Sequence, residues 1–427
     1  MGRTLLIIFV SLVFLLIGCV GDKAEPTPVP VTSEEAVAVG ENGVSPNALQ
    51  SSKNGLDIVF SGGGAKSIAQ IGALKEMEEQ GTTYRRLVGT SSGSIMATFL
   101  AAGYSADEMM AAITERTPDG DIILASFLDV PQGFEQAVVE ESLMFAFFEH
   151  FLDSFLPLET ADKFDEAVLG KLFVKEPFRE AFNFIENGGA YSGEEFMVWI
   201  RKYLDAGGRN LADATLQEFY EQTGNDLTLI VTDVTQGNML MVNHNTAPDV
   251  PIAWLVRMST SIPFVYENVI WQPEWGSYLG EDISGHVIVD GGLGSNMGIE
   301  LVISLEPEFV EAMGMEPDPG KVVGLFLDST IPVEGIEDHP QIEEEIHPDD
   351  TLHLRWTKVQ ERNQDLFDTF LRNHDHFVVR THPDKVCHLP VGGYDTLEFD
   401  MSEARAYLLF DSGQEAMGEC LQELETN

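Results

Sequence analysis

The stretch RLVGTSSGSIMATFLAAG, residues 86–103, decides the fold of this 427-residue chain. Its first residues, 86–88, predict a short strand, and the apolar run Ile95–Ala102 predicts a helix that the following glycine ends. Between them lies Gly89-Thr90-Ser91-Ser92-Gly93, whose flanking glycines relieve the crowding of a sharp turn from strand to helix. Such a turn projects the hydroxyl of Ser91 into a site where helix N–H groups face any developing negative charge.

A second strand and helix precede this turn. Residues Leu56–Phe60 are a short β-type run, and the cluster Gly62-Gly63-Gly64 follows them. The next residues place four apolar side chains on one helical face, those of Ile68, Ile71, Leu74 and Met77. The order strand, loop, helix, strand, turn, helix predicts a parallel sheet with helical crossovers, and therefore an α/β fold.

The rest of the chain continues this domain, which we expect to occupy residues 55–425 with a mainly helical insertion at about 120–225. Apolar runs predict three more strands, at Leu227–Thr232, Val287–Val289 and Val322–Leu327. The last part predicts, in order, an acidic surface loop at 331–352, a helix at 353–372, a strand at Phe377–Val379 and a final helix after Ser402.

The glycine cluster has a chemical reading as well as a structural one. Three glycines between a strand and a helix expose successive backbone N–H groups, which form a concavity that holds an anion. Gly62, Gly63 and Gly64 are therefore candidates for the oxyanion hole of an acyl transfer. The nucleotide motifs fit poorly, because Ala65 stands where a Walker A loop has its last glycine and Ser67 where a dinucleotide fingerprint has its third.

A third motif, Asp290-Gly291-Gly292, follows a predicted strand and places a carboxylate at the carboxyl-terminal edge of the sheet, where the sites of α/β proteins gather. Ser91 is inert without a base. Asp290 takes its proton directly if burial raises the pKa of the carboxyl group. The competing arrangement is a triad that adds His382 or His388, and Ser92 is the alternative nucleophile.

In this order and context, the three motifs resemble the patatin-like phospholipase family, which pairs a G-x-S-x-G serine with a D-G-G aspartate and uses a glycine-rich oxyanion loop. Three more segments resemble the family's central strand, its R-x-S-x-x-x-P segment and its late strand before the last helix: Leu229–Asp233, Arg257–Pro263 and Thr396–Asp400. The resemblance spans about residues 55 to 420. It implies a three-layer α/β sandwich, with a mainly parallel central sheet flanked by helices, and a dyad of Ser91 and Asp290 acting on lipid acyl esters.

Two features bear on rate and substrate. Ser67 stands where the family usually has glycine after the basic residue, and Met297-Gly298 replaces a common Asn-Pro. Both departures lie in supporting loops, so they affect the expected rate and substrate more than the chemistry.

The aromatic-rich segment 143–156 is either a buried core helix or an acyl-chain pocket or lid over Ser91.

The N-terminus is expected to be a targeting segment. The apolar run Leu5–Ile17 is short for a transmembrane span and typical of a signal-peptide core. Leu16-Ile17-Gly18-Cys19 resembles the lipobox of bacterial lipoproteins, in which the chain is cut before an acylated cysteine. We therefore expect a signal peptide at 1–18, a disordered tether at 19–54, and a protein anchored through acylated Cys19 to the periplasmic or cell-surface face of a bacterial membrane. An uncleaved anchor or an ordinary signal peptide is the alternative.

The net charge of −46, from 70 acidic and 24 basic residues, limits the kinds of partner that the protein can bind. It excludes nucleic acid, which needs a basic face, and attraction to anionic lipid, so membrane contact depends on the anchor and on apolar surface.

Cys387 and Cys420 are either a disulfide of the exported protein or two unpaired buried thiols. No Cys/His spacing suggests zinc, and we expect neither metal nor cofactor. The sequence does not indicate the oligomeric state.

The leading functional prediction is a lipid acyl hydrolase of the phospholipase A or lysophospholipase type, which forms an acyl-enzyme on its lipid substrate. Two alternatives remain at this point. One is a carboxylesterase that acts on small soluble esters. The other is a non-catalytic lipid-binding lipoprotein that keeps the fold.

Overall fold

The computed structural model describes residues 43–118, 120–134, 138–139, 141–146, 176–336 and 378–426. Four predicted features lie wholly or mostly outside the described residues: the N-terminal segment with Cys19, the aromatic segment beyond Ala146, the acidic loop beyond Ile336, and the predicted helix at 353–372. Within the described part, no helix combines the length and the apolar character that crossing a bilayer would require.

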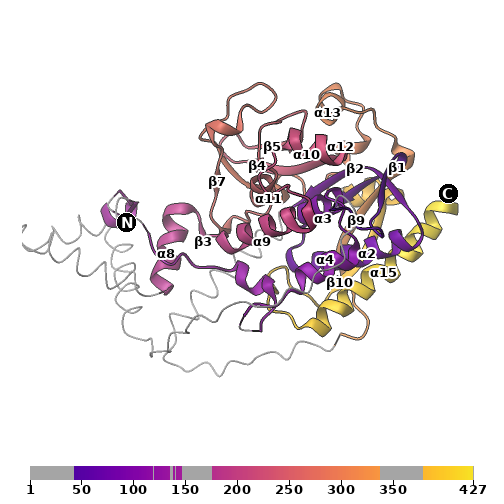
Figure 1. The fold of residues 1–427 in the computed structure, drawn as a ribbon, viewed down its shortest axis with the longest axis horizontal. Helices are drawn as coiled ribbons and strands as arrows, with labels where there is room; N and C mark the ends of the chain where they lie inside the picture. The colour runs from indigo at the N-terminus through magenta and orange to yellow at the C-terminus, as the bar shows by residue number, and fades with distance from the viewer. Residues whose placement is uncertain are drawn as a thin grey trace, which may run out of the picture.

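An eight-stranded sheet forms the centre of the molecule, with the order β10-β9-β1-β2-β4-β8-β7 and with β5 paired to β4 (Figure 1). Its strands are β1 (Gln50–Phe60), β2 (Thr83–Thr90), β4 (Asp226–Asp233), β5 (Asn238–Val242), β7 (Val269–Ile270), β8 (Val287–Asp290), β9 (Val322–Pro332) and β10 (Val386–Gly392). The neighbours from β10 to β4 are parallel, whereas β5 and β8 run antiparallel to β4 and β7 runs antiparallel to β8. The prediction of a mainly parallel sheet is confirmed.

Helices cover both faces of this sheet, which gives the expected three layers. They are α2 (Ile68–Glu79), α3 (Ser92–Ala101), α4 (Ala106–Ile113), α8 (Glu176–Asn187), α9 (Glu194–Asp205), α10 (Leu216–Thr223), α11 (Ile252–Ser259), α12 (Glu300–Ile303), α13 (Pro307–Met313) and α15 (Glu403–Thr426). Short 3-10 turns include η2 (Gly64–Ser67), η3 (Ile123–Phe127) and η8 (Pro383–Lys385), and a two-stranded sheet pairs β3 (Gly189–Tyr191) with β6 (Phe264–Tyr266).

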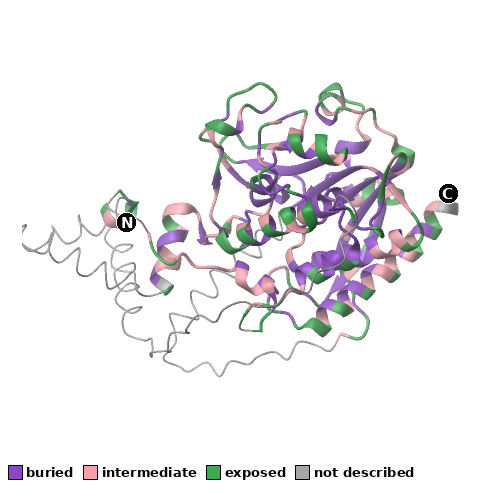
Figure 2. Ribbon diagram, viewed as in Figure 1, coloured by how far each residue is buried: buried purple, intermediate pink, exposed green. Residues whose placement is uncertain are grey.

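Successive side chains of a strand point to opposite faces of the sheet, and apolar side chains on both faces bury both of them. Ile58, Phe60 and Leu87 belong to one apolar cluster, which α2, α3, α4, α9, α11 and α15 complete. Val59 and Val88, one position along, belong to a second cluster with α12 and α13. Figure 2 shows the buried residues concentrated in these strands. Near-continuous apolar strands are therefore what this fold requires.

Three predicted features differ in detail, and one strand was not predicted. β1 begins at Gln50, before the expected start of the folded part. The predicted strand at 377–379 is wrong, because Val378 and Val379 are helical, and their branched side chains pack into the second cluster all the same. Thr396–Asp400 is a turn and no strand. The strand of that region is β10, which no predicted strand covers.

A disulfide joins Cys387 of β10 to Cys420 of α15, with a Cα–Cα distance of 5.8 Å. The alternative of two unpaired thiols is therefore wrong. α15 also lies directly against α2, where two glycines let the backbones meet. A Cβ atom at Gly72 would lie 1.8 Å from the carbonyl oxygen of Phe410, and one at Gly413 equally close to that of Ala69. The last helix is thus fixed at both the sheet edge and the helical layer.

Candidate active site

The strand register brings Ser91 and Asp290 together. β5 pairs with one edge of β4, and β2 and β8 share the other edge. β2 runs parallel to β4 and β8 runs antiparallel to it, so the two strands point toward each other along this edge. β2 ends with Thr90 beside Ile230, and β8 ends with Asp290 beside the next residue, Val231. The carboxyl ends of the two strands therefore meet. Asp290 reaches the expected edge of the sheet, but on an antiparallel strand.

Ser91 occupies a strained turn that its neighbours hold in place. Its φ of 53° and ψ of −130° are unusual for a residue with a side chain. Its N–H donates to Ser259 Oγ at 3.0 Å, and the Ser259 hydroxyl donates to the carbonyl oxygen of Ile230 at 2.8 Å. The flanking glycines are required here, because a Cβ atom at Gly89 or Gly93 would lie 2.6 Å from a backbone oxygen.

Asp290 is buried and its two carboxylate oxygens differ. Oδ1 accepts the N–H of Gly292 at 2.7 Å, whereas Oδ2 has no hydrogen bond of ordinary geometry to any described residue. Burial raises the pKa of Asp290 to about 7, against the lowering effects of the Ser91 hydroxyl and the Gly292 N–H. The Ser91 hydroxyl is thus close enough to stabilise the carboxylate, although the contact is looser than a standard hydrogen bond.

The glycine loop lies beside Ser91, but two of its N–H groups already have partners. A Cβ atom at Gly62 would lie 2.8 Å from that of Ser91. The Gly62 N–H donates to the carbonyl oxygen of Asn296 at 3.2 Å, and the Gly63 N–H donates to Ser92 Oγ at 3.0 Å. The Gly64 N–H donates to none of the residues that the structure describes. The partner of Gly62 is a backbone carbonyl, whereas the hydroxyl on Gly63 can rotate away, so Gly63 and Gly64 are better placed than Gly62 to receive an oxyanion.

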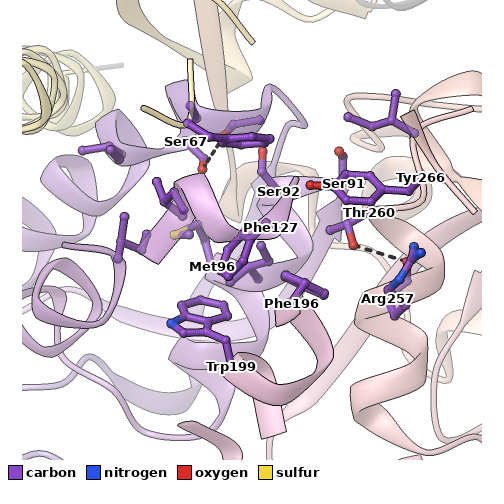
Figure 3. Close-up of a pocket in the computed structure, with 18 residues that line it drawn as sticks. Ser67, Ser91, Ser92, Met96, Phe127, Phe196, Trp199, Arg257, Thr260 and Tyr266 are labelled. Atoms are coloured by element: carbon purple, nitrogen blue, oxygen red, sulfur yellow. Dashed lines mark hydrogen bonds between the residues drawn. The ribbon is translucent and has the colours of Figure 1, made fainter. Parts of the chain in front are cut away.

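A cavity opens beside Ser91 and Ser92 (Figure 3). Its apolar walls come from Ile68, Ile95, Met96, Ile113, Leu124, Phe127, Phe196, Trp199, Ile262, Tyr266 and Phe399. Aromatic side chains of η3 and α9 form part of these walls, whereas the described residues 143–146 of the predicted aromatic segment do not line the cavity. The described Met144 belongs to a separate small cluster with Phe178 and Phe182.

The cavity residues of α9 were missed, although the sequence carries a signal for them. Phe196 and Trp199 are three positions apart on an amphipathic helix, and this spacing puts both rings on one face. The rings of Phe127 and Phe196 make an edge-to-face contact at a centroid distance of 5.3 Å. The polar wall residue Arg257 is buried, which lowers its pKa, and it donates to the carbonyl oxygen of Ser192 at 2.9 Å.

The amino-acid sequence from residue 58 to residue 303 matches the family model of the patatin-like phospholipases. The match covers more than half of the chain and contains Ser91, Asp290 and the glycine loop. The chain belongs to the patatin-like phospholipase family. Membership of this family agrees with the mainly parallel sheet described above.

Known relatives of this patatin-like chain share only part of its length. The uncharacterized protein YqhO of Bacillus subtilis is 31% identical over 252 residues, which are 58% of this chain and 66% of the relative. Uncharacterized NTE family proteins of Mycobacterium bovis and Mycobacterium tuberculosis are 34% identical over 98 residues, 22% of this chain and 16% of theirs. The chain thus matches less than two thirds of these relatives' lengths.

Solved structures similar to this chain include two bacterial proteins. VipD from Legionella pneumophila has a TM-score of 0.44 at 15% identity, over 92% of this chain and 70% of that one. A chain of the ExoU-SpcU complex of Pseudomonas aeruginosa has a TM-score of 0.35 at 16% identity, over 95% and 62%.

The two histidines of the competing triad lie away from the patatin-like site. His388 is on β10, and the strands β9 and β1 lie between β10 and β2. Three strand spacings put β10 about 14 Å from β2. Its Nδ1 lies 2.8 Å from Asp328 Oδ2. His382 precedes η8, and no histidine is among the described residues that line the cavity. Among the described residues, no three His, Cys, Asp or Glu side chains gather as a metal site.

Proposed function

We propose that this chain hydrolyses fatty-acyl esters of phospholipids, in the manner of a phospholipase A or lysophospholipase, through an acyl-enzyme on Ser91. The observation that carries the proposal is the meeting of β2 and β8, which puts a buried carboxyl group of raised pKa behind a strained serine at an apolar cavity. Family membership supports the coarser statement, lipid hydrolysis.

The proposed reaction uses two side chains and the glycine loop. Ionised Asp290 takes the proton of the Ser91 hydroxyl as Oγ attacks the ester carbonyl carbon. The Gly63 and Gly64 N–H groups stabilise the oxyanion, which displaces the Ser92 hydroxyl from Gly63. Protonated Asp290 then gives its proton to the departing alkoxide. In the second half, Asp290 deprotonates a water molecule that attacks the acyl-enzyme, and it then returns this proton to Ser91 Oγ as the fatty acid is released.

The cavity would hold the acyl chain. Its walls are aliphatic and aromatic, and each methylene group buried there contributes about 0.8 kcal/mol. Lengthening the acyl chain should therefore raise kcat/KM about fourfold per methylene until the cavity is full. A carboxylesterase for small soluble esters would show no such dependence, so the series separates these two readings.

Labelling with a fluorophosphonate probe tests the nucleophile and separates a hydrolase from a non-catalytic lipid-binding protein. We expect labelling of the parent and of Ser92→Ala, and none of Ser91→Ala. Ser91 is expected to react because its hydroxyl stabilises the Asp290 carboxylate, whereas Ser92 accepts the Gly63 N–H. Labelling that persists in Ser91→Ala and disappears in Ser92→Ala would overturn the assignment.

We also propose export and lipid anchoring through Cys19, on the strength of the sequence Leu16-Ile17-Gly18-Cys19. Cys19→Ala should move the protein from the membrane to the soluble fraction of cells. Unchanged fractionation would instead favour retention of the apolar run as an anchor.

A further inference from the structure

Phe264 combines a strained backbone conformation with an exposed side chain, and neither contributes to the stability of the fold. Its φ is +70°, in the left-handed region that glycine adopts freely and bulky residues avoid. Its side chain is also 54% exposed, so the ring gains little from burial. A glycine at this position would remove the strain and an apolar surface together. The presence of phenylalanine therefore calls for a role outside the folded core.

The position of Phe264 links it to the cavity. Ile262 and Tyr266, two residues to either side, both line the cavity wall. In regular extended backbone Phe264 and Tyr266 would point to the same face. The left-handed conformation breaks this alternation, and Tyr266 is only 7% exposed. The turn at Phe264 thus presents an aromatic ring to solvent directly beside the wall of the site.

Other apolar side chains extend this surface. The Phe264 ring lies 5.9 Å from that of Phe184 on α8, and its N–H donates to the carbonyl oxygen of Gly188 at 3.1 Å. Ile185, next to Phe184, is 36% exposed. We call Phe264, Phe184 and Ile185 the Phe264 cluster. In Figure 1, α8 and β3 lie at the opposite end of the molecule from the C-terminus.

We propose that the Phe264 cluster docks the protein on a zwitterionic phospholipid surface, with the Phe264 ring inserted among the lipids at the side of the acyl cavity. This inference rests on the proposed function and specifies how its substrate is reached. Apolar rings at the boundary of head groups and acyl chains are typical of interfacial contacts. The net charge of −46 opposes adsorption to anionic lipid, so a zwitterionic surface is the one that this cluster fits.

The chain offers a matched control. Leu279 is also a non-glycine residue at positive φ, 50°, and its side chain is also 54% exposed. Its N–H donates to the carbonyl oxygen of Thr246, in the loop that follows β5. β5 runs antiparallel to β4, so this loop lies at the end of the sheet opposite Ser91. Leu279 therefore shares the strain and exposure of Phe264 but not its place beside the cavity.

A fluorescence experiment tests the inserted ring. Full-length Phe264→Trp and Leu279→Trp are titrated with phosphatidylcholine vesicles, and the emission of the parent is subtracted. We expect a blue shift with vesicles for the tryptophan at position 264 alone. The proposal is overturned by the absence of that shift, by an equal shift at position 279, or by a shift that needs higher protein concentration and no lipid, which would assign the surface to a second copy.

An activity experiment tests the consequence. Phe264→Gly should lower the rate of phosphatidylcholine vesicle hydrolysis about tenfold, the effect of removing one inserted ring. Its rate on a soluble short-chain ester should stay at the parent value, and Leu279→Gly should change neither rate. Neither variant should lower Tm, since glycine relieves the left-handed backbone.

The outcomes separate this inference from the proposed function. An equal loss by Phe264→Gly on both substrates would place Phe264 in the catalytic cavity and overturn the docking role. A parent that cleaves neither substrate would overturn the proposed function. The fluorescence shift would in that case still decide the docking surface, because it does not depend on turnover.

Discussion

Replacing Asp290 by asparagine should stabilise the fold above neutral pH and abolish activity at the same time. Asparagine keeps the shape of the side chain, and its oxygen can still accept the Gly292 N–H. It cannot ionise, so it removes the free energy required to hold a charge in a fully buried site. Activity should fall by several orders of magnitude, because the base and the nucleophile act as one unit.

The size of the stability effect follows from the pKa of Asp290, which is raised from 3.8 to about 7. A carboxyl group whose pKa is raised on folding binds its proton more tightly in the folded state. Its contribution to stability is present below the unfolded-state pKa and is lost as the pH rises through 7. The complete loss is about 4 kcal/mol, of which about 2–3 kcal/mol falls between pH 5 and pH 8.

Chemical unfolding of the parent and of Asp290→Asn across this pH range measures the effect. The other titrating groups are shared by the two proteins, so their contributions cancel in the difference. The advantage of the variant in free energy of unfolding should grow by about 2–3 kcal/mol from pH 5 to pH 8. A difference that stays constant with pH would refute the reasoning from a buried, ionising carboxyl group, even with activity lost.

Three further outcomes are expected. Ser259→Ala should lower kcat about 10- to 100-fold with little change in KM, since it leaves the nucleophile's N–H without its acceptor; an equal change in KM would contradict a positioning role. His382→Ala and His388→Ala should each keep most of the esterase activity, and loss in either with the fold intact would restore the triad. Joint replacement of Cys387 and Cys420 by alanine should lower the free energy of unfolding by about 3–4 kcal/mol in denaturant titrations, and no change would show that the bridge contributes nothing.

The turn at Ser91 could be predicted because its requirements are local. Gly89 and Gly93 are both needed within five residues of Ser91, and the apolar runs on either side fix the order of strand and helix. For Asp290 the sequence sets only a condition, that burial raise the pKa of its carboxyl group. The buried position of Asp290 and its raised pKa meet that condition.

The direction of β8 and the walls of the cavity could not be predicted, for different reasons. A strand buried on both faces has the same apolar pattern whether it runs parallel or antiparallel, so Val287–Val289 carries no information on direction. The cavity joins Phe127, Phe196 and Phe399 from distant parts of the chain, and their pairing depends on tertiary packing. Val378 and Val379 show the limit of local propensity, since tertiary context makes these branched residues helical.

The meeting of two opposed strands on one edge of β4 also has a consequence for folding. Ser91 and Asp290 are roughly 200 residues apart, and pairing over such separations is slow because loop closure must precede it. Helices and the β1–β2 pair can form earlier without any active site. Slippage of β8 by one residue along β4 would turn the carboxyl group to the other face of the sheet. Recovered esterase activity after dilution from denaturant would therefore report the correct register of β8, and should lag behind the recovery of helical signal.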